Sequence, residues 1–172
     1  GIGADTLVTN LGTSSVTIAT DATTAGNGDI FINANIASTS ANSLTLKAHR
    51  HITQAAGVSV STQGGALTYW ADSDDNQSGS IIFSGATGTA TLSTNGGNIT
   101  LAGGADSGSG APAGYAFQIR STAGGALTLN TGGGNLLIKS KTNSTFYAML
   151  FADNTSFDAG TGSITMDAQQ TG

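Results

Sequence analysis

The amino-acid sequence predicts an all-β fold, a right-handed parallel β-helix (β-solenoid) with short extruded loops. Short apolar segments recur along the whole chain, and Gly, Asn, Ser or Asp separates each segment from the next. All ten acidic residues are Asp, which favours turns, and none is Glu, which favours helices. A repeat of short strands without intervening helices is typical of a solenoid, in which successive coils stack on one another.

The composition favours an ordered protein that neither binds nucleic acid nor contains disulfides. Only 9% of the residues are charged and 26 are Gly, a composition that also occurs in disordered chains. The regular placement of apolar residues favours an ordered core instead. The net charge of −5 gives no electrostatic case for nucleic acid, and the lack of Cys excludes disulfides. No apolar run approaches the ~20 residues of a membrane-spanning helix, so we expect no membrane insertion.

The expected strands follow in order along the first two thirds of the chain. Their centres are separated by gaps of 9 or 14 residues, which indicates coils built from a short and a long arc. We expect ~20 residues per coil and ~8 coils in parallel pairing with the common right-handed connection. The predicted segments are Leu7–Thr9, Val16–Ile18, Ile30–Ile32, Leu44–Leu46, Val58–Val60, and four more centred on Thr68, Ile82, Thr91 and Thr100.

The chain 1–172 is expected to be a single solenoid segment. Residues 28–63 align approximately with residues 64–95, which indicates an internal duplication. Loop insertions are predicted near 103–116, which contains the only proline (Pro112), and near 142–158. Because the sequence starts and stops inside its own pattern, we expect it to be a fragment or processed piece of a longer repetitive chain.

Alternation along each strand predicts which side chains enter the core. Residues i and i+2 share a face, so Thr in Leu-Thr-Leu points outward. Phe31, Ile82 and Leu137 are exceptions, with an apolar residue at the outward position. The inward rows are Leu44/Leu46, Leu67/Tyr69, Ile99/Leu101, Leu127/Leu129 and Ile164/Met166.

Glycines in the turns are expected to supply backbone angles that other residues adopt at a cost. These residues are Gly28, Gly65, Gly79, Gly97, Gly125, Gly134 and Gly162. The two ends of the column are expected to be open sheet edges that need a neighbour.

Residues 7–103 contain strings that resemble a known family. These are Asn-Leu-Gly-Thr-Ser-Ser-Val-Thr-Ile, Gly-Asp-Ile, Ser-Leu-Thr-Leu, and an Asp-rich turn after Gly-Ala-Leu-Thr. They resemble the repeat region of filamentous haemagglutinin-like exoproteins of bacterial two-partner secretion. The resemblance implies a right-handed parallel β-helix that forms the shaft of a large secreted surface protein. Members of that family serve as adhesins, biofilm-matrix proteins or carriers of toxin tips, and the motifs transfer no catalytic residues.

An Asp-rich turn is the sharpest candidate for a metal site. Asp72, Asp74, Asp75 and Asn76 place oxygen ligands close together, as a calcium site requires. The glycine and terminal Glu of an EF-hand loop are missing. We therefore prefer to interpret this segment as a solvated polar turn, with a calcium site as the alternative. No other cofactor is predicted.

His49 and His51, with Lys47 and Arg50, form the only cationic cluster in the sequence. Two His at i and i+2 on a strand share a face and are a candidate zinc pair, although no third ligand is near. We prefer to interpret these four side chains as polar surface residues that contact an anionic sugar or lipid, and not as a zinc site.

Aromatic residues are candidates for carbohydrate contacts. Trp70, Tyr115 and Tyr147 are the binding candidates, with loop packing as the preferred interpretation. Tyr69 and Trp70 are adjacent on one strand, so they cannot both lie in the core.

Polysaccharide cleavage requires converging carboxylates or a base beside cationic groups. The sequence offers few groups for this reaction. Asp153 and Asp158 flank Asn154, and Arg120, Lys139 and Lys141 lie on neighbouring coils.

Seven threonines are expected on outward faces: Thr17, Thr45, Thr68, Thr91, Thr100, Thr128 and Thr165. A flat row of Thr is a candidate surface for binding ice. The irregular gaps favour the simpler interpretation that Thr is a good outward strand residue.

The repeat pattern and the resemblance together lead us to expect a non-enzymatic shaft segment of a large bacterial adhesin, at the cell surface or in the extracellular matrix. The alternatives are a polysaccharide-binding or polysaccharide-cleaving β-helix and an ice- or surface-binding solenoid. The expected partners are neighbouring solenoid segments of the same or identical chains, and cell-surface carbohydrate or protein.

Overall fold

The chain folds into three parallel β-sheets with one short helix. The computed structural model describes residues 1–22, 26–85, 87–107, 113–114, 119–121, 125–142, 145, 147–151 and 154–170. Consecutive strands enter the three sheets in a fixed rotation, so that each strand pairs with the strand about three places later. Every strand pair is parallel, which confirms the all-β parallel prediction.

Each sheet takes one strand from each round of the chain, and we call one such round a tier. The long sheet contains β1 (Val16–Ala19), β4 (Leu44–Lys47), β7 (Leu67–Ala71), β10 (Ile99–Gly103), β14 (Leu136–Thr142), β17 (Ile164–Gln170) and the short β11 (Ala113–Gly114). The short β11 is an extra strand of the long sheet within the fourth tier. The second sheet contains β2 (Ile30–Ile32), β5 (Ile52–Ala55), β8 (Ile81–Ser84), β12 (Ile119–Ser121) and β15 (Met149–Leu150). The third sheet contains β3 (Ile36–Ala37), β6 (Ser59–Ser61), β9 (Thr89–Ser93), β13 (Ala126–Asn130) and β16 (Thr155–Asp158).

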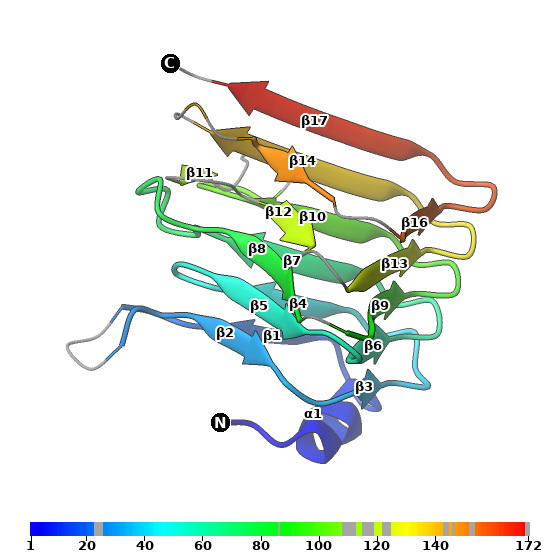
Figure 1. Ribbon diagram of the computed structural model, residues 1–172. Coiled ribbons are helices and arrows are strands. Elements are labelled where there is room, and N and C mark those ends of the chain that lie inside the picture. The colour runs from blue at the N-terminus through cyan, green and yellow to red at the C-terminus, as the bar shows by residue number, and fades with distance from the viewer. Residues whose placement is uncertain are drawn as a thin grey trace.

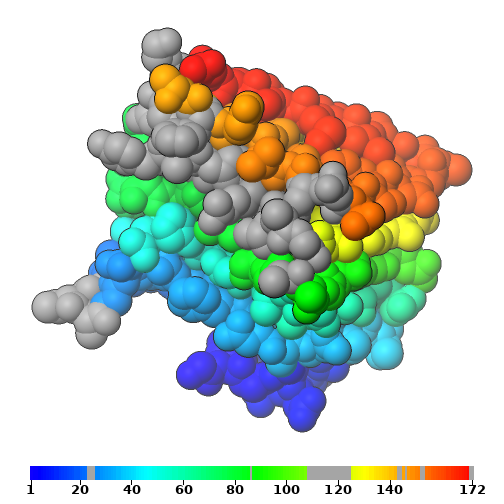
Figure 2. Space-filling model, viewed as in Figure 1, coloured from blue at the N-terminus to red at the C-terminus, as the bar shows by residue number. Residues whose placement is uncertain are grey.

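The tiers stack in sequence order along one direction. Figure 1 shows the N-terminal strands at one end and β17 at the other, and the colours of Figure 2 follow one another in the same order. Equivalent residues of the long sheet are 28, 23, 32, 37 and 28 apart, from Thr17 through Thr45, Thr68, Thr100 and Leu137 to Thr165. Because each tier contains three strands, the expected ~20 residues per coil was too short, and the expected ~8 coils were too many.

The internal duplication was correct for one of its three matched segments and wrong for the other two. The alignment matched the segment around residue 59 with that around residue 91, and these strands do stack. It also matched the segments around residues 31 and 45 with those around 68 and 82, which do not stack. The structure instead stacks β4 on β7, β5 on β8 and β6 on β9. The strand β5 was missed because Gln54, a polar residue, occupies one of its two inward positions.

The core is one continuous apolar cluster to which all three sheets contribute. The predicted inward pairs from Leu44/Leu46 to Leu127/Leu129 are buried. Gln54 is also buried, and its side chain is satisfied by the Tyr69 hydroxyl (2.7 Å) and the Val58 carbonyl (2.8 Å). Tyr69 is therefore the core residue of the Tyr69–Trp70 pair, and burial raises its pKa well above the usual value.

The row Ile164/Met166 is the exception among the predicted inward rows. It is in register with buried Leu136 and Ile138, yet Ile164 is 45% exposed and Met166 is 46% exposed. No described strand lies above β17, so the inward side of this strand is uncovered. The outward exceptions follow the alternation: Phe31 is 64% exposed, and Ile82 and Leu137 are half-buried.

The segment Leu7–Thr9 was predicted as a strand and this was wrong. It belongs to the helix α1 (Ala4–Leu11), which lies at the β1–β3 end of the stack (Figure 1). Leu7 and Leu11, one helical turn apart, are buried in the core. These two side chains cover the apolar core at this end. The Leu11 carbonyl accepts hydrogen bonds from Ser40 Oγ (2.6 Å) and Asn42 Nδ2 (2.7 Å).

α1 has eight residues, and within the described ranges no helix is long and apolar enough to cross a membrane. The two segments expected to be loop insertions contain strands. β11 lies within 103–116, while β15 and β16 lie within 142–158 and pair with β12 and β13. Pro112 lies outside the described residues.

The corner between the third sheet and the long sheet repeats the sequence Thr-x-Gly-Gly. Thr62, Thr94 and Thr131 are buried, and each donates a hydrogen bond from Oγ1 to the carbonyl of the second Gly (2.5 Å). These second glycines stack on one another: a Cβ on Gly97 would collide with the Gly65 carbonyl, and a Cβ on Gly134 with the Gly97 carbonyl. This buried ladder was not predicted, although Ser-Thr-Gln-Gly-Gly and Ser-Thr-Asn-Gly-Gly carry its signal.

The role that we predicted for the turn glycines is therefore correct for Gly28, with φ of +71°, and wrong for most of the others. Gly65, Gly79, Gly97, Gly134 and Gly162 do not have positive φ. They are required because a Cβ would meet a neighbouring tier. Gly125 is buried next to β13.

We predict that Gly97→Ala lowers the free energy of unfolding by about 1–3 kcal/mol, because the added methyl group forces two stacked corners apart. Gly26→Ala is the matched control, since a Cβ there has open space. Equilibrium denaturation in urea measures both variants. Equal stability of the two variants would contradict the close-stacking role of Gly97.

Candidate functional site

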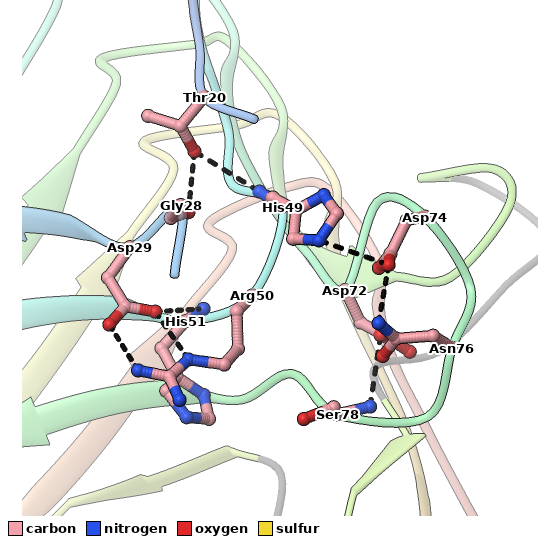
Figure 3. Close-up of polar contacts among 10 residues, drawn as sticks. All are labelled: Thr20, Gly28, Asp29, His49, Arg50, His51, Asp72, Asp74, Asn76 and Ser78. Atoms are coloured by element: carbon pink, nitrogen blue, oxygen red, sulfur yellow. Dashed lines mark hydrogen bonds and ion pairs between the residues drawn. The ribbon is translucent and has the colours of Figure 1, made fainter. Parts of the chain in front are cut away.

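Polar side chains gather at the corner between the long sheet and the second sheet. The corner is formed by three successive turns, one in each of the first three tiers, and Figure 3 shows their contacts. The turn after β1 supplies Thr20 and Asp29, the turn after β4 supplies His49–His51, and the turn after β7 supplies residues 72–80. We call these residues the polar corner.

An ion pair ties the first two turns together. Arg50 donates hydrogen bonds to both carboxylate oxygens of Asp29, from Nε at 2.8 Å and from Nη2 at 2.6 Å. The backbone N–H of His51 donates a third hydrogen bond to Asp29 (3.1 Å). The Arg50 contact is the main cause that lowers the pKa of Asp29, against a smaller opposing effect of burial. The ion pair therefore holds the turn after β1 against the turn after β4.

The two histidines do not form a metal pair. The ring of His49 faces Asp74 in the next tier, with Nε2 3.2 Å from Oδ2, whereas His51 lies near Asp29 and Arg50 (Figure 3). Burial lowers the pKa of His51, and its buried Nδ1 has no hydrogen-bond partner among the described residues. Lys47 is on β4, and its Nζ lies 4.3 Å from the centre of the Trp70 ring. The predicted cationic cluster is thus divided among three separate contacts.

The calcium candidates have different partners. Asp72 is fully buried and accepts a hydrogen bond from the Ser78 N–H (3.1 Å), which closes the turn. Asp74 accepts from Asn76 Nδ2 and faces His49. Asp75 donates its backbone N–H to the Asp72 carbonyl (2.9 Å). Over the part of the chain that the structure describes, no group of three or more His, Asp or Glu side chains converges as a metal site. The arrangement serves as a closed turn.

The aromatic candidates lie apart. Trp70 is half-buried on the outward side of β7, and its indole N–H donates to the Gly104 carbonyl (2.7 Å). Ala102, its partner on β10, is fully buried although it is at an outward position, consistent with cover from the Trp70 ring. Trp70 thus packs on the next tier, with Lys47 over its ring. Tyr147 is largely exposed, and Tyr115 lies outside the described residues.

The residues considered for polysaccharide cleavage are distributed over three sheets. Asp158 ends β16 in the third sheet, and its Oδ1 accepts the Gly160 N–H (2.8 Å). Lys139 and Lys141 are on β14 in the long sheet, and Arg120 is on β12 in the second sheet. Asn154 precedes β16, and Asp153 lies outside the described residues.

The outward threonines are aligned more regularly than we expected. Thr17, Thr45, Thr68, Thr100 and Thr165 occupy one row of the long sheet, with Leu137 between the last two. Thr91 and Thr128 are paired in the third sheet. The irregular sequence gaps conceal this row because connections of different length join strands that stack in register.

A shallow groove crosses the upper end of the same face. It has a volume of about 270 Å³. Its lining residues come from β10, β14, β17 and the residues that precede them: Asn98, Thr100, Asn135, Leu136, Leu137, Ser163 and Thr165. Sequence reasoning missed this groove because its residues are more than 60 positions apart at the extremes.

Comparison with known proteins gives no match: no family model, no curated protein and no solved structure matches the chain.

We predict that His51 makes the stability depend on pH. The folded state lowers the pKa of His51, so it binds fewer protons than the unfolded state. The associated stability is present above the pKa of an unfolded histidine, ~6.5, and is lost as the pH falls through the lower folded value. Thermal unfolding at stepped pH should show this fall in the parent chain and a smaller one in His51→Gln. The control His49→Gln should retain it, and parallel curves for the parent and His51→Gln would contradict the role of His51.

Proposed function

We propose that the chain is a non-enzymatic shaft segment of a large secreted bacterial adhesin, located at the cell surface or in the extracellular matrix. The three sheets would enclose the core as a right-handed parallel β-helix, because parallel strands joined by crossovers almost always take that hand. The resemblance of residues 7–103 to filamentous haemagglutinin-like exoproteins supports the adhesin assignment.

The observation that carries the proposal is the repeated tier on one continuous core, which remains uncovered at β17. Ile164 and Met166 present to solvent the side that is buried in the tier below. β17 (Ile164–Gln170) is also a terminal strand of the long sheet, and among the described strands it pairs only with β14. An edge strand with exposed apolar side chains is a template for pairing with a further strand. We therefore propose that a further tier, from the same or an identical chain, stacks on β17.

The opposite end would not stack in the same way. α1 covers the core there through Leu7 and Leu11. When the 172-residue chain is studied alone, we expect association through β17 to stop at dimers, because the side chains of α1 cover the apolar core at the opposite end.

We predict that the purified chain dimerises with increasing concentration and that Met166→Lys prevents this, because a charged side chain at the edge would have to be buried. Thr165→Lys is the matched control: it lies on the same strand but points to the outward face. Analytical ultracentrifugation and electron microscopy measure the association. A parent chain that stays monomeric at every concentration would contradict pairing at β17, and long filaments would contradict the capping role of α1.

The aligned Thr row favours a second candidate function, binding of ice or another ordered hydrated surface. Its hydroxyl groups repeat at the strand spacing, ~4.8 Å, over four consecutive tiers. Leu137 interrupts the row, and Lys47 and Trp70 project from the next outward column. We therefore place this function second.

If this second function holds, we predict that the chain shapes growing ice crystals, that Thr68→Lys loses the effect and that Thr128→Lys, in the third sheet, retains it. Microscopy of single ice crystals in dilute protein gives the measurement. Unshaped crystals in the parent protein would rule the function out.

A further inference from the structure

The groove on the long sheet contains two side-chain amides in a fixed orientation. Asn98 Oδ1 accepts the backbone N–H of Asn135 (2.8 Å), and Asn135 Oδ1 accepts the backbone N–H of Ser163 (3.0 Å). Since each oxygen is held by the tier above, each Nδ2 group is the free end of the amide. Neither Nδ2 has an acceptor among the described residues, and both side chains are exposed.

The lower tiers show that the ladder itself does not require Asn. At the equivalent positions, Ser15 Oγ accepts the N–H of Ser43 (3.0 Å) and Ser43 Oγ accepts the N–H of Ala66 (3.1 Å). A hydroxyl group therefore holds one tier on the next as well as an amide does. The amides at Asn98 and Asn135 add two outward donors that the stacking does not use.

The two donors are spaced by one strand separation, ~4.8 Å, because Ile99 and Leu136, the residues that follow them, are direct partners of β10 and β14. Beside the amides lie the hydroxyl groups of Thr100 and Thr165, with the apolar side chain of Leu137 between them in the row. The lining contains no charged residue. Lys139 and Asp167, in the adjacent outward column, face each other as opposite charges.

We propose that this groove binds a neutral, extended saccharide that runs along the stacking direction. Hydroxyl oxygens of the sugar accept hydrogen bonds from the two amide groups and exchange hydrogen bonds with the threonines. A C–H face of the sugar covers Leu137. The spacing of the donors is close to the length of one sugar unit in an extended β-1,4-linked glucan, so successive units meet successive tiers. This site differs from the aromatic candidates Trp70 and Tyr147, and it does not depend on the role of the chain as a shaft.

The test is a titration of the ¹⁵N-labelled 172-residue chain with cellohexaose, followed by the side-chain NH₂ resonances of Asn98 and Asn135. We expect saturable shifts at these two groups with a dissociation constant of about 1 mM, the range of a site with few neutral hydrogen bonds. The double variant Asn98→Ser/Asn135→Ser keeps the acceptors of the ladder, as Ser15 and Ser43 do, but lacks the outward donors. It should keep its melting temperature and bind at least about tenfold more weakly.

Two controls complete the experiment. Thr45→Val changes the same outward row outside the groove and should leave binding unchanged. Maltohexaose, a curved glucan, should bind more weakly than cellohexaose because it cannot follow a straight row of donors. The proposal is overturned if cellohexaose gives no saturable shift, if the double variant binds as tightly as the parent chain, or if the shifts lie away from the groove. Equal binding of the two glucans would overturn the extended shape of the ligand.

Discussion

The close stacking of one backbone corner directly on the next is the constraint on which this structure depends. At the Thr-x-Gly-Gly corners, the second glycine lies so near the carbonyl of the glycine below that a side chain has no room. The buried Thr hydroxyl of the same corner donates to the glycine carbonyl. Because a buried backbone carbonyl without a partner is costly, this hydrogen bond holds each corner in its shape. The absence of a side chain on the second glycine then lets successive corners approach to the strand spacing that the parallel ladders require.

That fixed register decides what the outer faces present. Side chains at equivalent positions of successive tiers form straight rows, so a single choice of residue is repeated along the stack. The Thr row of the long sheet and the Asn98–Asn135 pair both arise in this way. The row that contains this pair reads Ser15, Ser43, Ala66, Asn98, Asn135 and Ser163. The two Ser of the lower tiers only hold one tier on the next, whereas the two Asn also offer amide donors to solvent.

The two ends of the stack are chemically different. α1 covers the core at the first end with the apolar side chains of Leu7 and Leu11. β17 leaves Ile164 and Met166 about half-exposed above a complete core. The polar corner, in contrast, joins neighbouring tiers through two contacts, the ion pair of Arg50 with Asp29 and the contact of His49 Nε2 with the Asp74 carboxylate. The polar corner therefore binds the first three tiers to one another. The features that bear on partners are the difference between the two ends and the outward face of the long sheet.

The sequence alone determined the class of fold, because alternation and turn composition are local properties: the inward pairs from Leu44/Leu46 to Leu127/Leu129 follow from them. It also determined that Trp70 and Tyr69 face opposite sides. Only the tertiary structure decided the three-strand tier, the helix at residues 4–11, the partners of the polar corner and the groove of Asn98 and Asn135. These depend on which residues stack across connections of 23 to 37 residues, and a local pattern does not encode the length at which a chain returns to the same sheet.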